Sequence, residues 1–336
     1  MGRPKKEESS EENVKPKKSS AGTYLSADYI LDKETNIIKI CPSVDMVLGG
    51  GWPDGTVGLL ESPPKTGKTT LALKIGAKGQ QQFDKTIIYD NIENRLSVKN
   101  LKGIEGLDLS PEKFKIISST EGDILSTEQH FERAEKALND FPNSILIIDS
   151  FSSLSSAAER TKAYGDGYGG MDSRKYEGEF LRRVSPILPI NNSTIIGIAH
   201  VSQNIGTPGT SPKVSRAMLY QLDIRLSLKK VYPQGDWISG EKLIGQKVDV
   251  KCLTSALGSP GNSCVLWLKY GQGYLDSADF AQVGCDLGLI EKKGAGWFNI
   301  TKFDAKAQGM ESLCELIDTN KEIYNYLTKE ISSLLI

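Results

Sequence analysis

The stretch Leu60-Glu-Ser-Pro-Pro-Lys-Thr-Gly-Lys-Thr-Thr70 carries the most structural information in this chain. An apolar run at 57–60 leads into it, and a helix-prone run at 71–77 follows it. A strand, a tight loop and a Gly-Lys-Thr sequence at the start of a helix are the arrangement of a phosphate-binding P-loop. Backbone N–H groups of such a loop point at an anion, and the helix dipole favours negative charge there. The sequence therefore predicts a nucleotide phosphate site; a chance helix N-terminus is the alternative.

The residue types in this loop suit the binding of ATP with Mg²⁺. Gly67 has no Cβ to block a phosphate, Lys68 can reach the terminal phosphates, and the Thr69 hydroxyl can bind Mg²⁺. One position departs from the motif, because Ser62 stands where the first glycine is expected. The residues predicted to contact the nucleotide are Ser62, Pro63, Pro64, Lys65, Thr66, Gly67, Lys68, Thr69 and Thr70.

Composition limits the class of protein. A chain of 336 residues with a formal net charge of -1 suits one large domain with appendages. Residues 1–22 are rich in lysine and glutamate with almost nothing apolar, which predicts a disordered charged tail that either solubilises the protein or touches DNA. No apolar run is long enough to span a membrane, and the N-terminus does not resemble a signal peptide. We therefore expect a soluble, cytoplasmic protein without a membrane partner.

Cysteine and histidine usage argues against a metal centre built from these residues. The five cysteines are scattered and form no CxxC pair, so we expect reduced core thiols and no disulfides. The two histidines, His130 and His200, cannot build a metal site alone.

Apolar runs that alternate with helical stretches predict a mostly parallel sheet covered on both faces. The predicted strands are residues 37–40, 86–90, 114–117, 144–149, 194–199, 223–228 and 248–253, and a helix is predicted at 128–138. From about residue 271 the sequence changes to short turns and a final helix at 320–335. The fold class is therefore α/β, with a P-loop ATPase core around a twisted sheet and a small C-terminal α+β subdomain.

Polar residues follow three of the predicted strands. Because ligands bind at the carboxyl ends of parallel strands, we expect Asp90, Asp149 and His200 to gather beside the P-loop. Asp149 would hold Mg²⁺ opposite Thr69; a helix cap is the alternative. Glu93 is the first candidate to orient or deprotonate the attacking water and Asp90 the second, with turn and cap chemistry as the alternative for both.

His200 is expected to sense the γ-phosphate and to pass its presence to the loop that follows it. The alternative is a structural histidine with satisfied hydrogen bonds. Together with Glu93 and Lys68, His200 completes the predicted catalytic set.

Two long, polar, glycine-rich stretches, about 160–175 and 202–216, are predicted to bind single-stranded DNA. Loops of this length inside a domain tend to be functional, and basic and aromatic side chains are the ingredients of single-strand binding. The predicted DNA-binding residues are Tyr168, Arg174, Lys175, Lys213 and Arg216. Arg182 and Arg183 either join them or form a solvated helix face.

Together these stretches resemble the RecA family of recombinases, and in particular its phage UvsX-like branch. The likeness covers roughly residues 40–300, with specific matches at 62–70, 145–150, 165–174 and 284–297. The third match is similar to the family's first DNA-binding loop, and the fourth to its segment beyond the core. His200 stands where bacterial RecA has a glutamine and the UvsX-like branch has a histidine.

The resemblance implies a DNA-dependent ATPase that forms helical filaments on single-stranded DNA, with ATP at subunit interfaces. It would pair that strand with a homologous double-stranded DNA and exchange strands in recombination and repair. Residues 23–36 would be an N-terminal polymerisation segment, 37–270 a RecA-type core, and 271–336 the C-terminal subdomain. Mediator and single-strand-binding proteins are candidate partners, and a phage-encoded protein would work in the host cytoplasm.

The sequence departs from the family pattern at two places. Ile92 stands where the family has its catalytic glutamate, and Glu93 follows one residue later. Cys252 and Thr254 stand where lysines act on a neighbour's ATP, unless Lys247 or Lys251 substitutes. The alternatives are an ATP-binding paralogue or mediator with little hydrolysis, and a helicase built on the same core.

Overall fold

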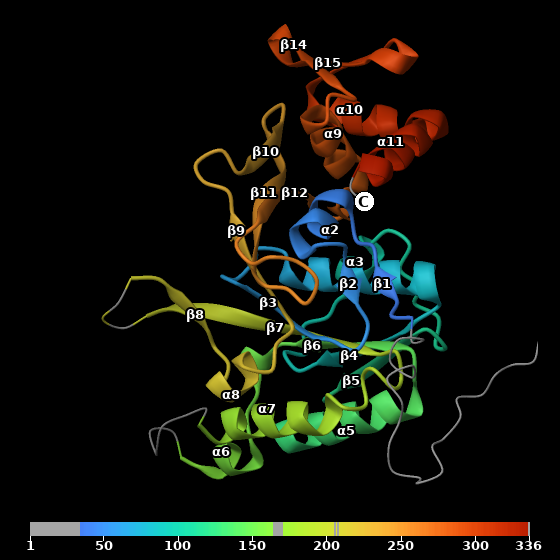
Figure 1. Cartoon of the computed structure of the whole chain (residues 1–336). Coiled ribbons are helices and arrows are strands. Elements are labelled where there is room, and N and C mark those ends of the chain that lie inside the picture. The colour runs from blue at the N-terminus through green and yellow to red at the C-terminus, as the bar shows by residue number, and fades with distance from the viewer. Residues whose placement is uncertain (1–33, 164–170, 205, 207, 335–336) are drawn as a thin grey trace, which may run out of the picture. The chain divides into compact units, whose positions relative to one another are not determined.

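A large twisted sheet organises the described part of the chain (Figure 1). The computed structural model describes residues 34–163, 171–204, 206 and 208–334. The residues divide into two units, 1–35 and 36–336, and every helix and strand described lies in the second unit. The predicted tail, most of the predicted polymerisation segment and Tyr168 lie outside the described residues.

The sheet has 11 strands, in the order β13-β12-β11-β9-β3-β7-β6-β4-β5, with β10 paired to β11 and β8 paired to β7. Its parallel part runs from β9 to β5, and the pairs beyond β9 are antiparallel. The parallel strands are β3 (Val57–Ser62), β4 (Thr86–Asn91), β5 (Phe114–Ser118), β6 (Ser144–Asp149), β7 (Thr194–Gln203) and β9 (Ile224–Lys230). The others are β8 (Thr210–Pro212), β10 (Asp236–Ser239), β11 (Lys242–Thr254), β12 (Ser263–Lys269) and β13 (Gly273–Tyr274).

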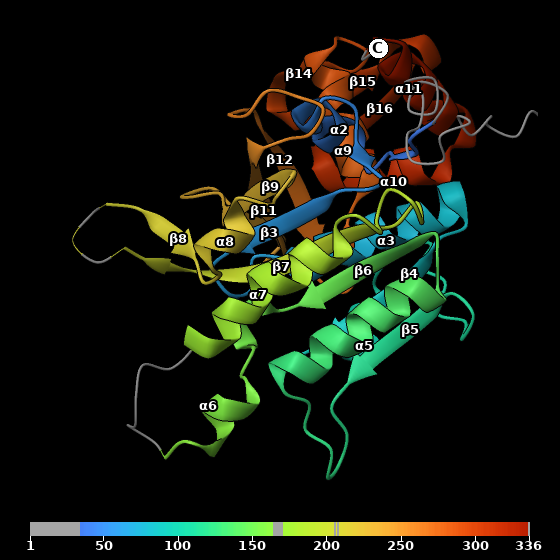
Figure 2. The ribbon, with the colours of Figure 1, turned by 60° about the horizontal axis from the view of Figure 1, so that its bottom comes forward.

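Helices cover both faces of the parallel strands, as predicted. Helix α3 lies on one face, and α5 and α7 lie side by side on the other (Figures 1 and 2). The longer helices of this core are α3 (Lys68–Phe83), α5 (Thr127–Asp140) and α7 (Met171–Val184). Shorter ones are α2 (Pro42–Leu48), α4 (Val98–Lys102), α6 (Ala157–Thr161) and α8 (Arg216–Leu219). A capping box starts α5, because Ser126 and Gln129 each bond the other's backbone N–H.

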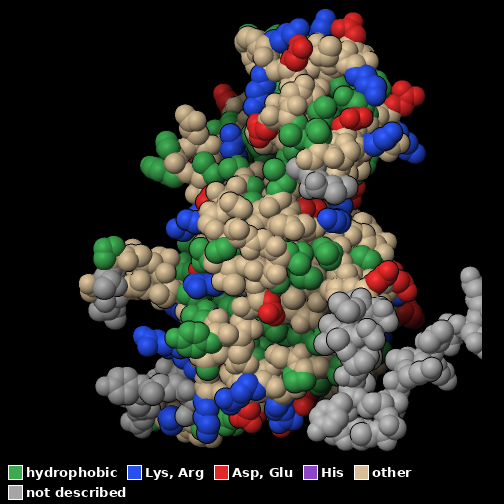
Figure 3. Space-filling view, in the orientation of Figure 1, with side chains coloured by type: hydrophobic (Ala, Val, Ile, Leu, Met, Phe, Trp, Pro, Cys, Tyr) green, Lys and Arg blue, Asp and Glu red, His purple; other side chains and the backbone are tan. Residues whose placement is uncertain are grey.

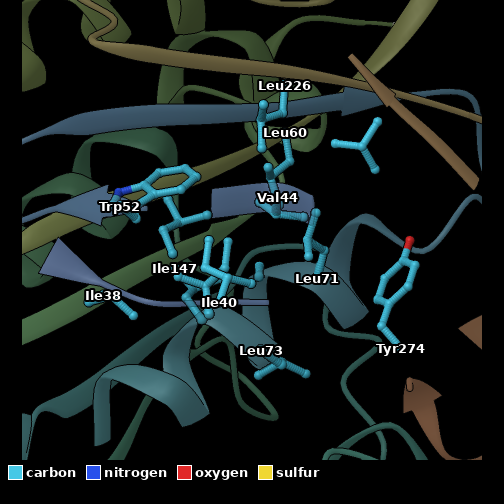
Figure 4. Close-up of a cluster of buried hydrophobic side chains, with 14 of the residues drawn as sticks. Ile38, Ile40, Val44, Trp52, Leu60, Leu71, Leu73, Ile147, Leu226 and Tyr274 are labelled. Carbon is cyan, nitrogen blue, oxygen red and sulfur yellow. The ribbon is translucent and has the colours of Figure 1, made fainter. Parts of the chain in front are cut away.

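The strands are apolar on both faces, and alternate residues belong to different cores. On the α3 side, the core contains Leu60, Ile87, Ile147 and Ile196 (the cluster in Figure 4). On the α5 and α7 side, it contains the neighbours of these residues along the strands: Leu59, Ile88, Leu146 and Ile195. The residue parity along each strand therefore fixes which face a strand-end side chain reaches.

Three elements differ from the sequence prediction. Strand β7 continues four residues past the predicted end at 199 and pairs antiparallel with β8, so part of the second predicted loop is a β-hairpin. Strand β11 is longer than 248–253 and begins at Lys242. Of the predicted strand 37–40 only β1 (Ile37–Ile38) is extended, and it pairs with β2 (Trp52–Pro53).

The C-terminal residues add a third, separate hydrophobic core. A small antiparallel sheet packs with three helices, of which the last agrees with the predicted range 320–335. These elements are α9 (Asp276–Asp286), β14 (Glu291–Lys293), β15 (Trp297–Ile300), β16 (Ala305–Gln308), α10 (Gly309–Thr319) and α11 (Lys321–Leu334). Helix α9 joins this part to the ATPase core, because Asp276 forms ion pairs with Lys74 and Lys78 of α3. Within the described ranges, no helix combines the length and the apolar character needed to cross a membrane.

Candidate nucleotide site

The loop between β3 and α3 has the backbone geometry that a phosphate cradle needs. Gly67 has a φ of +95°, and a Cβ there would collide with the phenol oxygen of Tyr274. The loop is supported from the antiparallel side of the sheet: the Tyr274 hydroxyl donates to Thr66 O at 3.3 Å, and Gln246 donates to Lys65 O at 3.1 Å. The N-terminus of the 16-residue helix α3 follows directly, so its N–H groups face the same space.

Lys68 lies over this loop. Its Nζ donates to the carbonyl and hydroxyl oxygens of Ser62 at 3.2 and 3.0 Å and to Pro63 O at 3.1 Å. Burial lowers the pKa of Lys68 to about 8, against the opposing effect of Asp149 and Glu93. The ammonium is therefore held by neutral oxygens, which an anionic phosphate would outcompete as a partner.

Thr69 and Asp149 meet as predicted for a magnesium site. The Thr69 hydroxyl donates to Asp149 Oδ2 at 2.8 Å, and the Tyr89 hydroxyl donates to the same oxygen at 2.5 Å. Burial raises the pKa of Asp149, while the bonds from Tyr89 and Thr69 oppose that rise.

These oxygen donors fit Mg²⁺, which prefers hydroxyl, carboxylate and phosphate oxygens and is commonly held by one or two protein groups plus a substrate's phosphates. No cluster of three or more acidic, histidine or cysteine side chains that could hold a metal alone occurs among the described residues.

Glu93 lies in the turn after β4 and faces the P-loop side of the site. Its Oε1 accepts hydrogen bonds from Ser150 Oγ at 2.8 Å and Ser153 Oγ at 3.0 Å, and lies 3.2 Å from His200 Nε2. Burial opposes ionisation, but these hydrogen bonds outweigh it and lower the pKa of Glu93. The carboxylate is thus ionised near neutral pH, and its Oε2 forms an ion pair with the exposed Arg95 at 3.5 Å.

His200 connects Lys68 to Glu93. Its Nδ1 lies 3.3 Å from Lys68 Nζ and its Nε2 lies 3.2 Å from Glu93 Oε1. An ammonium can only donate, so Nδ1 accepts and Nε2 carries the proton given to Glu93. His200 O in turn accepts from the backbone N–H of Lys213 at 2.8 Å, and Lys213 directly follows β8 of the β7–β8 hairpin. The predicted catalytic side chains Lys68, Glu93 and His200 therefore form one hydrogen-bonded chain.

The prediction that Asp90 lies beside the P-loop is wrong. Asp90 has the same parity as Ile88, so its side chain points to the α5 and α7 face. There it is fully buried and its Oδ1 lies 2.6 Å from His130 Nδ1 on α5. Its position removes it as a candidate for orienting the attacking water.

The described residues among the predicted DNA contacts lie on two adjacent elements. Arg174 and Lys175 are exposed on α7, Arg216 is exposed at the start of α8, and Lys213 is exposed shortly before α8. The elements are joined by Glu177 of α7, whose buried carboxylate accepts the Ser215 N–H at 2.5 Å. Lys and Arg side chains gather over α6 and α7 along the lower edge of Figure 3.

The positions where the family has lysines carry no charge here. Cys252 is fully buried, and its thiol donates to Thr254 O at 3.3 Å. Of the two basic neighbours, Lys247 lies 4.4 Å from the ring centroid of Trp267, and Lys251 is exposed on β11.

Sequence reasoning missed Tyr89, Ser150 and Ser153, which hold the two key carboxylates. Tyr89 sits in an apolar strand and has the appearance of a core residue. The signal that could have found it is parity: Tyr89 is two residues before Asn91, which pairs with Asp149 on the neighbouring strand.

The parallel sheet, the phosphate loop after β3 and the strand-end carboxylates define a P-loop nucleotide-binding core. The family model described as the RecA N-terminal domain matches residues 32–275, which is well over half of the sequence. The chain therefore belongs to the RecA family, whose members are DNA-dependent ATPases of recombination and repair that bind ATP with Mg²⁺ and form filaments on DNA.

Similar proteins agree with this assignment. Protein RecA of Porphyromonas gingivalis is 28% identical over 303 residues, covering 88% of this chain and 84% of that protein. Protein RecA of Phytoplasma mali is 28% identical over 297 residues, covering 86% and 83%. A crystal structure of the RadB recombinase shares the fold, with a TM-score of 0.51 at 20% identity over 70% of this chain and 98% of that one.

Proposed function

We propose that this protein is an ATP-dependent recombinase of the phage UvsX-like branch, which assembles on single-stranded DNA and pairs it with a homologous duplex. The observation that carries the proposal is the chain Lys68–His200–Glu93. It joins the phosphate loop and the candidate water-orienting carboxylate to the strand that continues into the second DNA-binding segment.

In this proposal the protein's own groups bind the nucleotide and prepare the attacking water. The P-loop N–H groups and Lys68 hold the phosphates, and Glu93 orients the water or accepts its proton. Thr69 and Asp149 would hold Mg²⁺, which when bound neutralises developing charge on the phosphates. Excess positive charge and preset hydrogen bonds around the terminal phosphate lower the barrier without rearrangement during reaction.

His200 couples the nucleotide to DNA. A γ-phosphate near Lys68 would compete with His200 Nδ1 for the Lys68 ammonium. Once the ammonium binds the phosphate, the His200 ring can exchange its hydrogen-bond partners. Its backbone carbonyl is bonded to Lys213, and a change at the ring is transmitted to the β7–β8 hairpin. Hydrolysis would reverse the change and release Lys213, Arg216, Arg174 and Lys175 from the phosphates of the strand.

A second candidate is supported by Cys252 and Thr254: a paralogue or mediator that binds ATP and DNA but hydrolyses little. The absence of charge at these two positions removes a source of positive charge that one copy would give to its neighbour's ATP. Under this alternative, ATP would still regulate DNA binding, while single-stranded DNA would not accelerate phosphate release.

The test is phosphate release by purified protein with and without single-stranded DNA, together with electron microscopy of the same samples. The proposal predicts DNA-stimulated hydrolysis, helical filaments, and the loss of ATP binding and filaments in Lys68→Ala. The matched control is Lys78→Ala. Lys78 lies further along α3 and forms an ion pair with Asp276, away from the phosphate loop. Strand exchange by Lys68→Ala at the wild-type rate would contradict the mechanism, and filaments without DNA-stimulated hydrolysis would favour the second candidate.

A further inference from the structure

We propose that Tyr89 is a positioning residue for the magnesium-binding carboxylate: its phenol holds Asp149 in the orientation in which it can bind a Mg²⁺–nucleotide. The inference rests on the proposed ATP-binding function and deepens it. Tyr89 would act through Asp149 and would not itself touch the metal or the nucleotide.

Strand register places the two side chains together. Strands β4 and β6 are parallel neighbours in which Asn91 lies opposite Asp149 and Tyr89 lies opposite Ile147. Tyr89 and Asp149 are therefore diagonal neighbours on the same face, the face covered by α3. A tyrosine is long enough to cover one diagonal step along the sheet, and its hydroxyl reaches Asp149 Oδ2 at 2.5 Å.

The phenol is fixed as a donor. Tyr89 is 1% exposed, and its ring stacks on Phe114 with 6.2 Å between centroids and 21° between planes. A carboxylate oxygen has no proton to give, so the Tyr89 hydroxyl is the donor and Asp149 Oδ2 is the acceptor.

Two donors converge on one carboxylate oxygen. Thr69 Oγ1 and the Tyr89 hydroxyl both donate to Oδ2, from α3 and from β4. The Asp149 carboxyl group is then held from two sides, and both of these bonds go to Oδ2 and neither to Oδ1. A hydroxyl that coordinates a metal still keeps one proton to donate, so this arrangement is compatible with the metal role of Thr69.

Partners behind a metal's own ligands fix ligand orientation and typically change metal affinity about 10-fold to 100-fold when removed. Without the phenol, Asp149 keeps its bond to Thr69 but loses its support from β4. The carboxylate gains rotational freedom, and binding Mg²⁺ has to restore the lost order. The expected defect is therefore in Mg²⁺ affinity and not in nucleotide affinity as such.

The experiment is a Mg²⁺ titration of mant-ADP fluorescence with wild type, Tyr89→Phe and Tyr324→Phe. Phenylalanine keeps the ring of Tyr89 and its contact with Phe114. In Tyr89→Phe the Mg²⁺ concentration for half-maximal binding should rise about 10-fold or more, with unchanged mant-ADP affinity in EDTA. Tyr324→Phe removes a half-buried phenol of the C-terminal core, whose ring packs against Phe280, and should leave the Mg²⁺ dependence unchanged.

A second variant separates positioning from general damage to the fold. In an Asp149→Asn background, Tyr89→Phe should have no further effect on the Mg²⁺ dependence, because its target is already lost. The inference would be overturned, and the proposed function left standing, by either of two results. One is an unchanged Mg²⁺ requirement in Tyr89→Phe. The other is that Tyr89→Phe raises the Mg²⁺ requirement by the same factor in the Asp149→Asn background as in wild type. Wild-type protein that binds mant-ADP equally with and without Mg²⁺ would overturn the proposed function and the inference together.

Discussion

Replacing Glu93 by glutamine should stop hydrolysis while leaving nucleotide binding intact. The side-chain amide oxygen can accept the same hydrogen bonds that Ser150 and Ser153 donate at 2.8 and 3.0 Å, so the turn after β4 keeps its shape. An amide cannot accept the proton of the attacking water at neutral pH. General base catalysis contributes about 10²-fold to 10⁴-fold, which corresponds to about 3–5 kcal/mol in the activation barrier.

The matched control is Asp90→Asn, the other carboxylate near the end of β4. Asp90 is buried on the opposite face and bonded to His130, so its loss should destabilise the fold without removing a reacting group. The assay is single-turnover phosphate release from ATP with single-stranded DNA, well below the melting temperatures of both variants, with mant-ADP affinity measured in parallel. The role of Glu93 as the group that accepts the water's proton is refuted if Glu93→Gln retains near wild-type hydrolysis. It is also refuted if fully folded Asp90→Asn loses hydrolysis to the same extent as Glu93→Gln.

Three further predictions concern DNA binding, stability and pH. Arg174→Ala should weaken single-strand binding and reduce the slope of log K against log salt by about one phosphate contact, measured by fluorescence anisotropy; an unchanged slope removes Arg174 from the interface. Lys85→Met should lower the free energy of unfolding by about 3–5 kcal/mol in urea titrations, because it strands the buried Asp54 carboxylate whose ion pair with Lys85 is 2.7 Å long; a loss no larger than that of the exposed Lys136→Ala would contradict this. Burial raises the pKa of Glu177 to about 7, against hydrogen bonds from Ser215 and the charge of Arg174, so its contribution to stability is present in acid and is lost as pH rises through about 7. Glu177→Gln should therefore gain stability relative to wild type between pH 5 and 8, and equal pH profiles would refute the assignment.

The sequence was sufficient for the fold and for most of the candidate site. Continuous apolar strands that alternate with helices require a doubly covered parallel sheet, and the Gly-Lys-Thr sequence places the nucleotide at its carboxyl edge. Thr69, Asp149, Glu93 and His200 follow from that placement, because Thr69 opens the helix after the phosphate loop and the other three lie at or within a few residues of the end of an expected strand. The structure brings these four together.

The sequence was not sufficient to predict which face of the sheet a strand-end side chain points to. Asp90 and Asp149 both end apolar strands, and a strand buried on both faces has no polar alternation to show which way its last residue points. The structure shows that Asp149 shares the α3 face with Tyr89, while Asp90 shares the other face with Ile88. The β7–β8 hairpin was missed for a different reason: two of its three residue pairs join polar residues, and the stretch between the strands has the glycine-rich composition of a loop.

In the proposed mechanism, His200 couples nucleotide binding to DNA binding. The deciding measurement is the affinity for a fluorescent single-stranded oligonucleotide without nucleotide, with ADP and with a slowly hydrolysed ATP analogue, each in the presence of Mg²⁺. Tighter binding with the ATP analogue than with ADP or no nucleotide, and loss of that difference in His200→Ala, is the result we predict. One and the same affinity in all three nucleotide conditions would contradict the coupling.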